Sequence, residues 1–405
     1  MPSVARARRH ALRNAGAPAG GRAAPRKAGG SVSGGGTAAC ARWLGGDWLA
    51  ERDGPGPDWH PGALGQGAVL ASSGRAAIAD VLRALAMPGS VVLLPAYACP
   101  ALTQAVLLAG CQPDYYPGDI FLRPDWAALA SLARTKRAAA AVVVHPWGWL
   151  QDGDAMRRLR ASGVAVLEDA SHTLTNASGQ RVAGPDAATA MAASLRKTLP
   201  VAAGGLGRAW QGALPPTAPA QGPDSFAAAR REALRQPAGP SRHRALQRAE
   251  SVLDRQSAPP APHPSVALAL QELAERPPAA GVGWRRACRT NWSALREALA
   301  GGACSPWADT LPEGVCPTGF VVRHPDRSRL AAWLLRQGIE ATLHWPVAPV
   351  ARPKLTRPER LLAGSVLTLP CDGRFTPEDM DAIAAACRSL PAGGRTNGHP
   401  RESLQ

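Results

Sequence analysis

The chain has 405 residues, which is long enough for two domains with a sizeable core, and its net charge is +16. No stretch reaches the ~18 consecutive apolar residues that a membrane span needs, and no apolar core with a cleavage site indicates a secretory signal. Eight scattered cysteines without a C-x-x-C pair indicate reduced thiols, which argues against a disulfide framework or a zinc site. We therefore expect a cytoplasmic protein with no membrane partner and no bound metal.

The first forty residues are rich in Gly, Ala and Arg and contain seven Lys or Arg and no acid. Such a segment has too few apolar side chains to fold, so residues 1–40 are expected to be a disordered basic tail. A basic tail can contact nucleic acid, but no reader motif accompanies it, so no nucleic-acid partner is expected. A second disordered tail is expected at residues 393–405.

Short apolar strands alternate with helices along the next hundred residues. The first strand runs into the turn Ser72-Ser73-Gly74, and a helix follows at 75–85. The later strands are expected at 91–95, 114–116, 140–145 and 164–169. The helices between them are expected at 99–108, 126–132 and 154–161. This alternation predicts βαβ units, and therefore an α/β fold with a mostly parallel sheet sandwiched by helices.

The second half of the chain has a different pattern. Two helices are expected within the Pro- and Arg-rich residues 211–265, and longer ones at 265–275 and 284–299. The last hundred residues predict strands at 319–323 and 341–344 and helices at 329–337 and 376–387, with Thr376 as an N-cap. We therefore predict a large α/β domain at 41–250 and a smaller C-terminal α+β domain at 251–392.

Lys197 has the clearest chemical signature in the chain. The 46 basic residues include only four lysines, of which the others are Lys27, Lys136 and Lys354. A lysine amine can be deprotonated and form a Schiff base with a carbonyl, whereas an arginine stays protonated. About twenty-five residues upstream, an apolar strand ends in Glu168-Asp169-Ala170-Ser171-His172. Acid, histidine, serine and lysine in this order indicate a pyridoxal 5'-phosphate (PLP) site.

Ser73, Gly74 and Asp169 fit the two ends of this cofactor. Ser73 and Gly74 lie between a strand and a helix, where backbone N–H groups and the helix dipole can bind a phosphate. Asp169 ends a buried strand, where an ionised carboxylate needs a positive partner such as a pyridinium nitrogen. The alternatives are a turn that only caps its helix and an aspartate that only caps its strand.

The remaining three residues would act at the reacting end of the cofactor and at its phosphate. His172 would hydrogen-bond the phenolic oxygen of the cofactor, with a purely structural histidine as the alternative. Ser194 would donate its hydroxyl to the phosphate. Lys197 would hold the cofactor covalently and then move a proton during the reaction. Lys197 and Asp169 are therefore the predicted catalytic residues.

Several segments resemble those of the DegT/DnrJ/StrS-type aminotransferases, which are fold type I PLP enzymes that mostly aminate nucleotide-linked keto-sugars. The resemblance covers residues 66–205 and 265–390. It is carried by Ser73-Gly74-Arg75-Ala76-Ala77, Leu94-Pro95-Ala96-Tyr97, Val144-His145-Pro146-Trp147-Gly148, the 168–172 segment, Gly184-Pro185-Asp186-Ala187, Gly338-Ile339-Glu340, His344-Trp345-Pro346 and Leu367-Thr368-Leu369-Pro370. It implies a PLP-dependent aminotransferase that takes an amine from an amino acid and works as a homodimer.

The same resemblance adds site residues. Arg75 stands at the threonine of the family's phosphate turn and is a further candidate for binding the phosphate or an anionic substrate. Cys99 stands at the position of the aromatic residue that stacks on the cofactor ring, which leaves Tyr97 or His172 to cover the ring. His344 is a candidate substrate-binding residue.

Two departures separate the chain from the family pattern. Ser194 precedes Lys197 by three residues where the family usually has five. The family segment Gly-Tyr-Asn-Tyr-Arg, whose asparagine reaches the neighbouring subunit's cofactor phosphate, is replaced by the proline-rich residues 257–263. Two alternatives to transamination therefore stay open: elimination or dehydration on the same scaffold, and a non-catalytic regulatory or binding protein.

Overall fold

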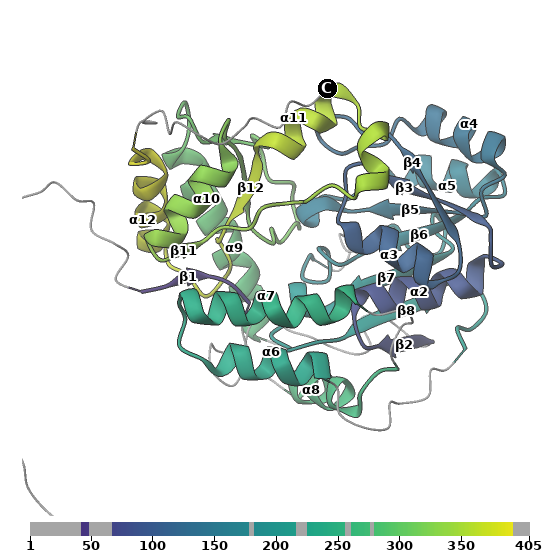
Figure 1. Ribbon diagram of the computed structural model, residues 1–405, viewed down its shortest axis with the longest axis horizontal. Helices are drawn as coiled ribbons and strands as arrows, with labels where there is room; N and C mark the ends of the chain where they lie inside the picture. The colour runs from purple at the N-terminus through teal and green to yellow at the C-terminus, as the bar shows by residue number, and fades with distance from the viewer. Residues whose placement is uncertain are drawn as a thin grey trace, which may run out of the picture. The chain divides into compact units, whose positions relative to one another are not determined.

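A seven-stranded sheet forms the centre of the N-terminal half (Figure 1). The computed structural model describes residues 42–47, 67–177, 182–215, 225–255, 261–275 and 279–391. In spatial order the strands are β2 (Ala68–Ala71), β8 (Gly205–Ala209), β7 (Ala190–Ser194), β6 (Ala165–Asp169), β5 (Ala140–Val144), β3 (Val91–Pro95) and β4 (Gln112–Tyr116). Only β8 runs antiparallel to its neighbours, so the other six strands end at the same edge of the sheet.

Helices cover both faces of this sheet, which is why β3, β5, β6 and β7 are mostly apolar. Val142 of β5 packs in the cluster that contains α2 (Gly74–Leu85) and α3 (Pro100–Leu108). The next residue, Val143, packs on the opposite face against α4 (Trp126–Lys136) and α5 (Gly153–Ala161). Helix α8 (Pro264–Ala274) covers the β7–β8 part of that second face. The predicted α/β sandwich is confirmed.

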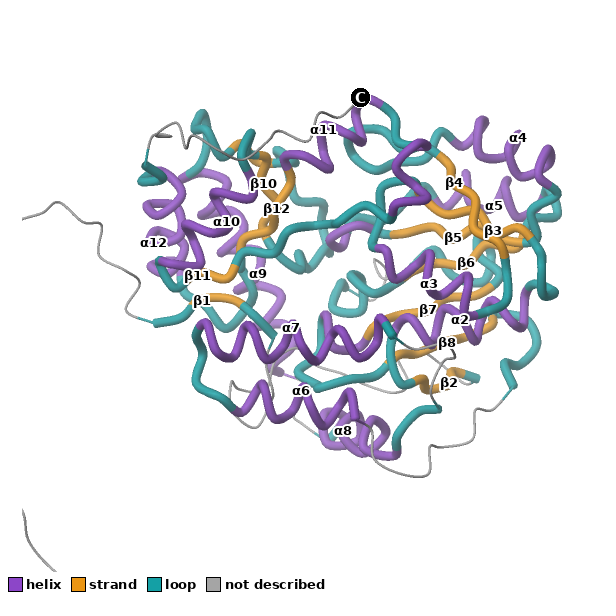
Figure 2. Tube along the Cα trace, viewed as in Figure 1, coloured by secondary structure: helices purple, strands orange, loops and turns teal. Residues whose placement is uncertain are grey.

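Helices α6 (Ser225–Arg235) and α7 (Pro240–Asp254) form a helical hairpin after β8. They lie side by side in Figure 2 and share a small cluster with Ala202, which includes Leu234 and Leu246. The reversal between them contains Gly239, whose φ of 152° is readily available only to glycine. The expectation of two helices between 211 and 265 is confirmed.

A second core lies in the C-terminal part. Strand β10 (Phe320–Arg323) pairs antiparallel with β12 (Val366–Leu369) and β9 (Ser305–Pro306). The helices that supply this core are α9 (Ala279–Ala298), α10 (Arg327–Arg336) and α12 (Pro377–Arg388). Thr376 caps α12 as predicted, in a reciprocal capping box with Asp379. Helix α11 (Arg357–Ser365) and the short helices η2 (Pro146–Gly148), η4 (Leu195–Lys197) and η5 (Pro349–Lys354) complete the elements used below.

The structure corrects two expectations. Strand β1 (Leu44–Gly45) pairs with β11 (Ile339–Glu340), and Leu44 belongs to the C-terminal core, so these residues do not lie with the large domain as predicted. The predicted boundary at residue 250 also falls inside α7. The rest of the domain division stays a prediction, and both predicted tails lie outside the described residues.

The strand expected at 341–344 is wrong. Thr342 forms only an isolated bridge with Thr368, and the backbone beyond it leaves the sheet. The carbonyl of His344 accepts from the Tyr97 hydroxyl and from Arg327 at 3.0 Å, so side chains satisfy a group that a strand would use in its ladder. Among the described residues, no helix is both long and apolar enough for a bilayer, and no group of three His, Cys, Asp or Glu is arranged for a metal.

Candidate active site

The predicted site residues meet at one edge of the large sheet. Ser73 follows β2, Tyr97 follows β3, Asp169 ends β6, and Lys197 lies in the short turn η4 directly after β7. Because these four strands are parallel, their carboxyl ends lie at the same edge, which is where α/β sheets bind ligands.

The turn at Ser73 and Gly74 lies directly against Ser194. A Cβ added at Gly74 would stand 2.5 Å from the Ser194 Cβ, so only glycine fits here. Ser73 caps α2 by accepting from the Ala76 N–H at 3.2 Å, and the first turn of the helix is thereby ordered. The side chain of Ser72 is buried, and within the described part of the chain its hydroxyl has no hydrogen-bond partner. A helix N-terminus with serines on two sides is a suitable cradle for a phosphate group.

Asp169 presents a buried carboxylate at the end of β6. Its side chain accepts one hydrogen bond, from the Ser171 N–H at 3.0 Å, and the residue is only 7% exposed. Within the described part of the chain, no Lys, Arg or His forms an ion pair with it. A buried carboxylate without a cation is unfavourable, and the protonated ring nitrogen of PLP is a cation of the right kind.

Lys197 and His172 face each other, with Nζ and Nε2 3.4 Å apart. The Nδ1 atom of His172 accepts from the Trp147 N–H at 3.0 Å, so a neutral His172 carries its proton on Nε2. Burial, followed by the nearby charges of Lys197 and His344, holds the pKa of His172 well below 6.5, which keeps the ring neutral. His172 can therefore donate to Lys197 Nζ when that nitrogen is unprotonated, the form that attacks a carbonyl.

The C-terminal part closes the site from the opposite side. Burial raises the pKa of Tyr97 to about 12, and its hydroxyl donates to the His344 carbonyl and accepts from the Trp345 N–H at 3.2 Å. His344 Nδ1 lies 3.2 Å from Trp147 Nε1 and 2.7 Å from the Thr368 hydroxyl. Burial, with smaller contributions from the charges of Lys197 and Arg327, lowers the pKa of His344 to about 3. Tyr97 thus joins the two parts of the chain.

An aromatic wall surrounds these contacts. Trp147 is fully buried, stacks on Trp345 with ring centroids 5.3 Å apart, and meets Trp307 edge-on at 4.9 Å. Its φ of 52° is unusual for a bulky residue and is held by the hydrogen bonds to His172 and His344. The sequence has 12 tryptophans against seven Tyr and Phe together, and three of the tryptophans meet here. Two sequence signals point to this wall: the tryptophan-rich composition, and the resemblance of the segments around Trp147 and Trp345 to those of the family.

Glu168 and Asp169 are adjacent but have different environments. Glu168 is fully buried and lies 3.0 Å from His145 Nε2, and it accepts from the Ala183 N–H at 2.8 Å. His145 Nδ1 accepts from the Gln151 N–H at 3.1 Å. Glu168 therefore braces the loops after β5 and β6, and Asp169 has no comparable set of partners.

Arg75 and Cys99 do not meet the other candidates in a direct contact. The two terminal nitrogens of Arg75 donate to the Leu253 carbonyl at 2.6 Å and to Asp254 at 2.9 Å, both at the end of α7. Its side chain thus faces neither the solvent nor the phosphate turn. Cys99 precedes α3 and is half-buried, close enough to Arg196 to affect that residue's charge environment.

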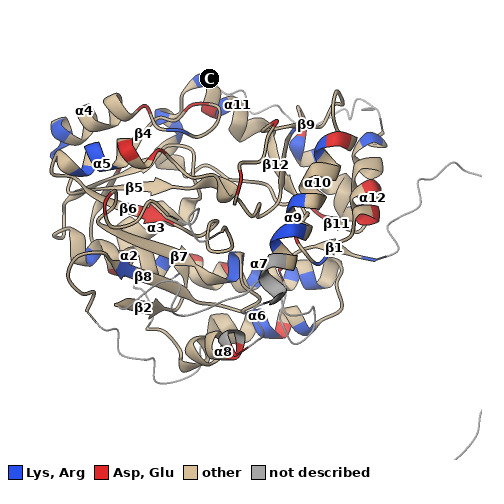
Figure 3. Cartoon of the chain, turned by 180° about the vertical axis from the view of Figure 1, so that it is seen from behind, with Lys and Arg blue, Asp and Glu red and all other residues tan. Residues whose placement is uncertain are grey.

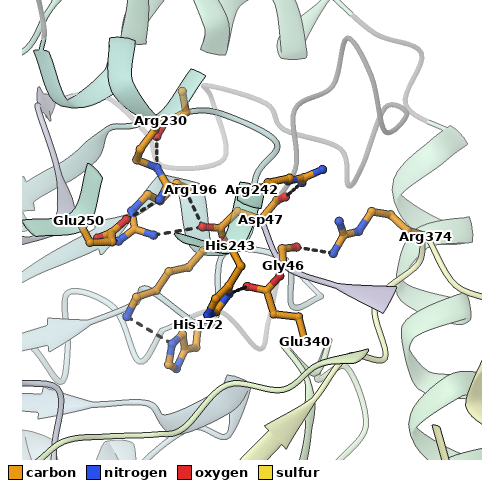
Figure 4. Close-up of polar contacts among 12 residues, drawn as sticks. Gly46, Asp47, His172, Arg196, Arg230, Arg242, His243, Glu250, Glu340 and Arg374 are labelled. Atoms are coloured by element: carbon orange, nitrogen blue, oxygen red, sulfur yellow. Dashed lines mark hydrogen bonds and ion pairs between the residues drawn. The ribbon is translucent and has the colours of Figure 1, made fainter. Parts of the chain in front are cut away.

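A network of charges surrounds Arg196, the residue before Lys197 (Figure 4). Arg196 donates to Glu250 at 2.7 Å, and the buried Arg230 binds both Glu250 and, at 2.6 Å, Asp47. Burial raises the pKa of Asp47, but Arg230 and Arg196 outweigh it and bring that pKa to about 2. No local sequence pattern predicts this network, because its members are far apart along the chain.

Residues 64–207 match the model of the DegT/DnrJ/EryC1/StrS aminotransferase family. The similarity of the chain to this family lies in this segment. The segment contains all the predicted cofactor-binding residues, from Ser73 to Lys197. No curated protein sequence matches the whole chain significantly.

Solved structures of this kind share the fold over most of the chain. One is DesV from S. venezuelae in complex with a ketimine intermediate. It is 21% identical, with a TM-score of 0.57, and the alignment covers 86% of this chain and 90% of DesV. The PLP form of the sugar aminotransferase Spr1654 from Streptococcus pneumoniae is 15% identical, with a TM-score of 0.57 and coverages of 80% and 86%. The 3-amino-5-hydroxybenzoic acid synthase is 17% identical, with a TM-score of 0.59 and the same coverages. The predicted fold type is confirmed, and the predicted resemblance to the aminotransferase family is confirmed over residues 64–207.

Proposed function

We propose that the protein uses PLP to transfer an amino group from an amino acid to a keto-sugar. The observation that carries this proposal is that three groups lie at one sheet edge. They are the amine of Lys197, the carboxylate of Asp169, which has no cation partner among the described residues, and the turn at Gly74 that can cradle a phosphate. Ser73, Gly74 and Ser194 would hold the phosphate, and Asp169 would hold the proton on the ring nitrogen. These residues fit the two ends of PLP, since one end is anionic and the other becomes cationic.

When bound, PLP supplies the electron sink for charge that develops at the α-carbon of the amino acid. Lys197 Nζ would take the proton from that carbon and deliver it to C4′ of the cofactor, the carbon on the other side of the transferred nitrogen. His172 orients Nζ through their 3.4 Å contact. The buried aromatic wall of Trp147 and Trp345 would exclude water from the site and so protect the reacting atoms from hydrolysis.

An arginine-lined groove supports a phosphate-bearing substrate. The groove has a volume of about 510 Å³ and is lined by Arg285, Arg286 and Arg289 of α9, with Gly314 opposite. Figure 3 shows these basic residues on α9. Arg285 donates to the Thr175 carbonyl at 3.5 Å, in the loop that carries His172, and Arg289 donates to the Pro312 carbonyl at 2.7 Å.

The arginines of this groove are available for an anion. Within the described residues none of them forms an ion pair, and the nearby Glu313 is exposed and forms none either. Arginine is well suited to bind phosphate because its planar group offers two parallel donors. We therefore infer a keto-sugar linked to a nucleotide through phosphates.

The experiment that tests this function is a transamination assay with the PLP-loaded protein. We expect an amino sugar as the product, detected by mass spectrometry, and faster turnover with nucleotide-linked keto-sugars than with the free sugars. A product that has lost water or ammonia without gaining an amine would contradict transamination. Equal rates with nucleotide-linked and free keto-sugars would contradict the proposal of a nucleotide-linked substrate.

We also propose a homodimer, as the resemblance to fold type I enzymes implies. Sedimentation of the full chain and of a chain without residues 1–40 tests this. We expect twice the monomer mass in both, since the basic tail lacks the apolar residues to form an interface. A monomer for the full chain would contradict the dimer.

A further inference from the structure

Helix α7 contacts both halves of the proposed cofactor site. Glu250 in its last turns accepts from Arg196 at 2.7 Å, and Arg196 directly precedes Lys197. The end of the helix accepts from Arg75, through the Leu253 carbonyl at 2.6 Å. Arg75 directly follows Gly74 of the phosphate turn. One helix thus holds the neighbours of the two groups that the cofactor must reach.

The contact at Arg196 belongs to a network of charges. Asp47 and Glu250 are the acids, and Arg196 and Arg230 are the bases, so the four charges balance. Arg230 is 1% exposed and also donates to the Ala202 carbonyl at 2.7 Å. A buried charge with a partner at each of its three nitrogens can occupy few alternative arrangements, so the network fixes the direction of Arg196.

The contact at Arg75 is of a different kind. Its side chain is 10% exposed and lies at the C-terminal end of α7, where free carbonyl groups and the helix dipole favour a cation. Asp254 adds a second partner at 2.9 Å but is itself 58% exposed. Breaking the Asp254 contact alone is therefore a mild change, suited to a test that must preserve the fold.

We propose that α7 is a bracket that sets the Lys197 turn at the correct distance from the phosphate turn, with Arg196, Glu250 and Arg75 as positioning residues. Lys197 lies in a single three-residue turn, so its direction depends on what holds its neighbours. Misplacing a reacting group by about 1 Å slows a reaction about a hundredfold. This inference rests on the proposed function, since it requires PLP at this site.

Two probes separate the two halves of the bracket. PLP reduced with borohydride labels Lys197 covalently, so the labelling rate at saturating PLP reports the lysine turn. Pyridoxamine phosphate has no aldehyde and cannot join a lysine, so its dissociation constant reports the phosphate turn. Wild-type protein that does not label at Lys197 overturns the proposed function together with the bracket.

Glu250→Gln tests the lysine half. We expect it to lower the labelling rate about tenfold, in line with the loss of a hydrogen bond to a charged group, and to change the pyridoxamine phosphate affinity less than twofold. The rate should fall at every pH without a shift of the pH profile, which separates positioning from a direct charge effect on Nζ. The matched control is Glu232→Gln, an exposed glutamate of α6 without a described ion pair, which should change neither value.

Asp254→Asn tests the phosphate half and separates positioning from direct binding. If α7 positions the turn through Arg75, this variant weakens pyridoxamine phosphate binding by about threefold, in the range of a partly exposed ion pair, and leaves the saturated labelling rate unchanged. If Arg75 itself binds phosphate, freeing it from Asp254 should strengthen the binding, and that result overturns the bracket.

A general loss of folding gives a different pattern from the bracket. In that case both values would fall together in Glu250→Gln and in Asp254→Asn, and this result would overturn the proposal. If Glu250→Gln does not fold, Arg196→Lys keeps the positive charge and loses the reach to two carboxylates. The same selective loss of labelling is expected from it, and unchanged labelling would count against the bracket.

Discussion

The sheet edge and helix α7 contribute to the same site in different ways. At the sheet edge, Asp169, His172 and Ser73 follow their strands within a few residues, so the local chain places them. The contacts of α7 join residues far apart, with 54 positions between Arg196 and Glu250 and 178 between Arg75 and Leu253. The reactive side chains of this site are therefore placed by their neighbours in sequence, whereas their orientation depends on contacts between residues far apart in sequence.

Replacing Lys197 tests the chemical side of this contrast and should have the largest effect. Lys197→Ala is expected to abolish covalent labelling by PLP and borohydride, because no other amine lies at the sheet edge among the described residues. Peptide mapping of the reduced protein measures this. Lys136→Ala and Lys354→Ala are the controls, since both lysines pair with Asp114, at 3.0 and 3.5 Å. A label on either would contradict the assignment.

Asp169→Asn should have the next largest effect. The folded protein should still bind PLP, but its turnover should fall by several orders of magnitude, because a neutral amide no longer keeps the ring nitrogen protonated. Steady-state kinetics beside a cofactor titration measure the two properties separately. Near-normal turnover would mean that Asp169 serves only to cap β6 through the Ser171 N–H.

The same contrast explains how much the sequence could predict. Strands β3, β5 and β6 are runs of Val, Leu and Ala between turns, and they were predicted close to their observed bounds. Strands β7 and β8 read AMAAS and GLGRA and were missed, because alanine and glycine carry little strand preference. Their small residues are explained by the fold, since a Cβ at Gly205 would stand 2.1 Å from the Ser73 carbonyl oxygen.

The residues of the candidate site also fall into those that local sequence predicts and those that distant contacts place. Lys197, Asp169 and His172 could be found from their order and from the rarity of lysine. The role of Arg75 could not be found, because its partners lie in a helix that no local pattern connects to the phosphate turn. Tyr97 or His172 was expected to cover the cofactor ring. The hydrogen bonds of Tyr97 to the backbone of His344 and Trp345 depend on contacts between distant segments.

The contacts of His344 with residues distant in sequence can be tested through the pH dependence of stability. Its pKa is lowered to about 3 in the fold and is about 6.5 in an unfolded chain, so between these values the unfolded state binds more protons. The contribution of His344 to the free energy of unfolding is therefore complete above pH ~6.5. It declines as the pH falls, by at most about 1.4 kcal/mol per pH unit. His344→Gln should flatten this slope in urea unfolding measured at several pH values. An unchanged slope would mean that His344 titrates normally in the fold.

Arg286→Ala should have the smallest effect, because Arg286 is an exposed residue of α9 and water screens its charge. If the groove binds the phosphates of the substrate, this variant should raise KM about three- to tenfold for a nucleotide-linked keto-sugar, with kcat little changed. That pattern is expected when an interaction is equally strong in the bound substrate and in the transition state. The effect should shrink as salt is added, since the screening length falls from about 10 Å at 0.1 M to about 3 Å at 1 M.

Arg296→Ala is the matched control for this variant, because Arg296 is exposed on the same helix and does not line the groove. It removes the same charge from α9, so a general electrostatic attraction of the substrate would raise KM equally in both variants. A selective rise for Arg286→Ala, absent with an unphosphorylated keto substrate, would place the phosphates in the groove. Equal KM values for Arg286→Ala and the wild type would instead leave substrate selection to the sheet edge and its aromatic wall.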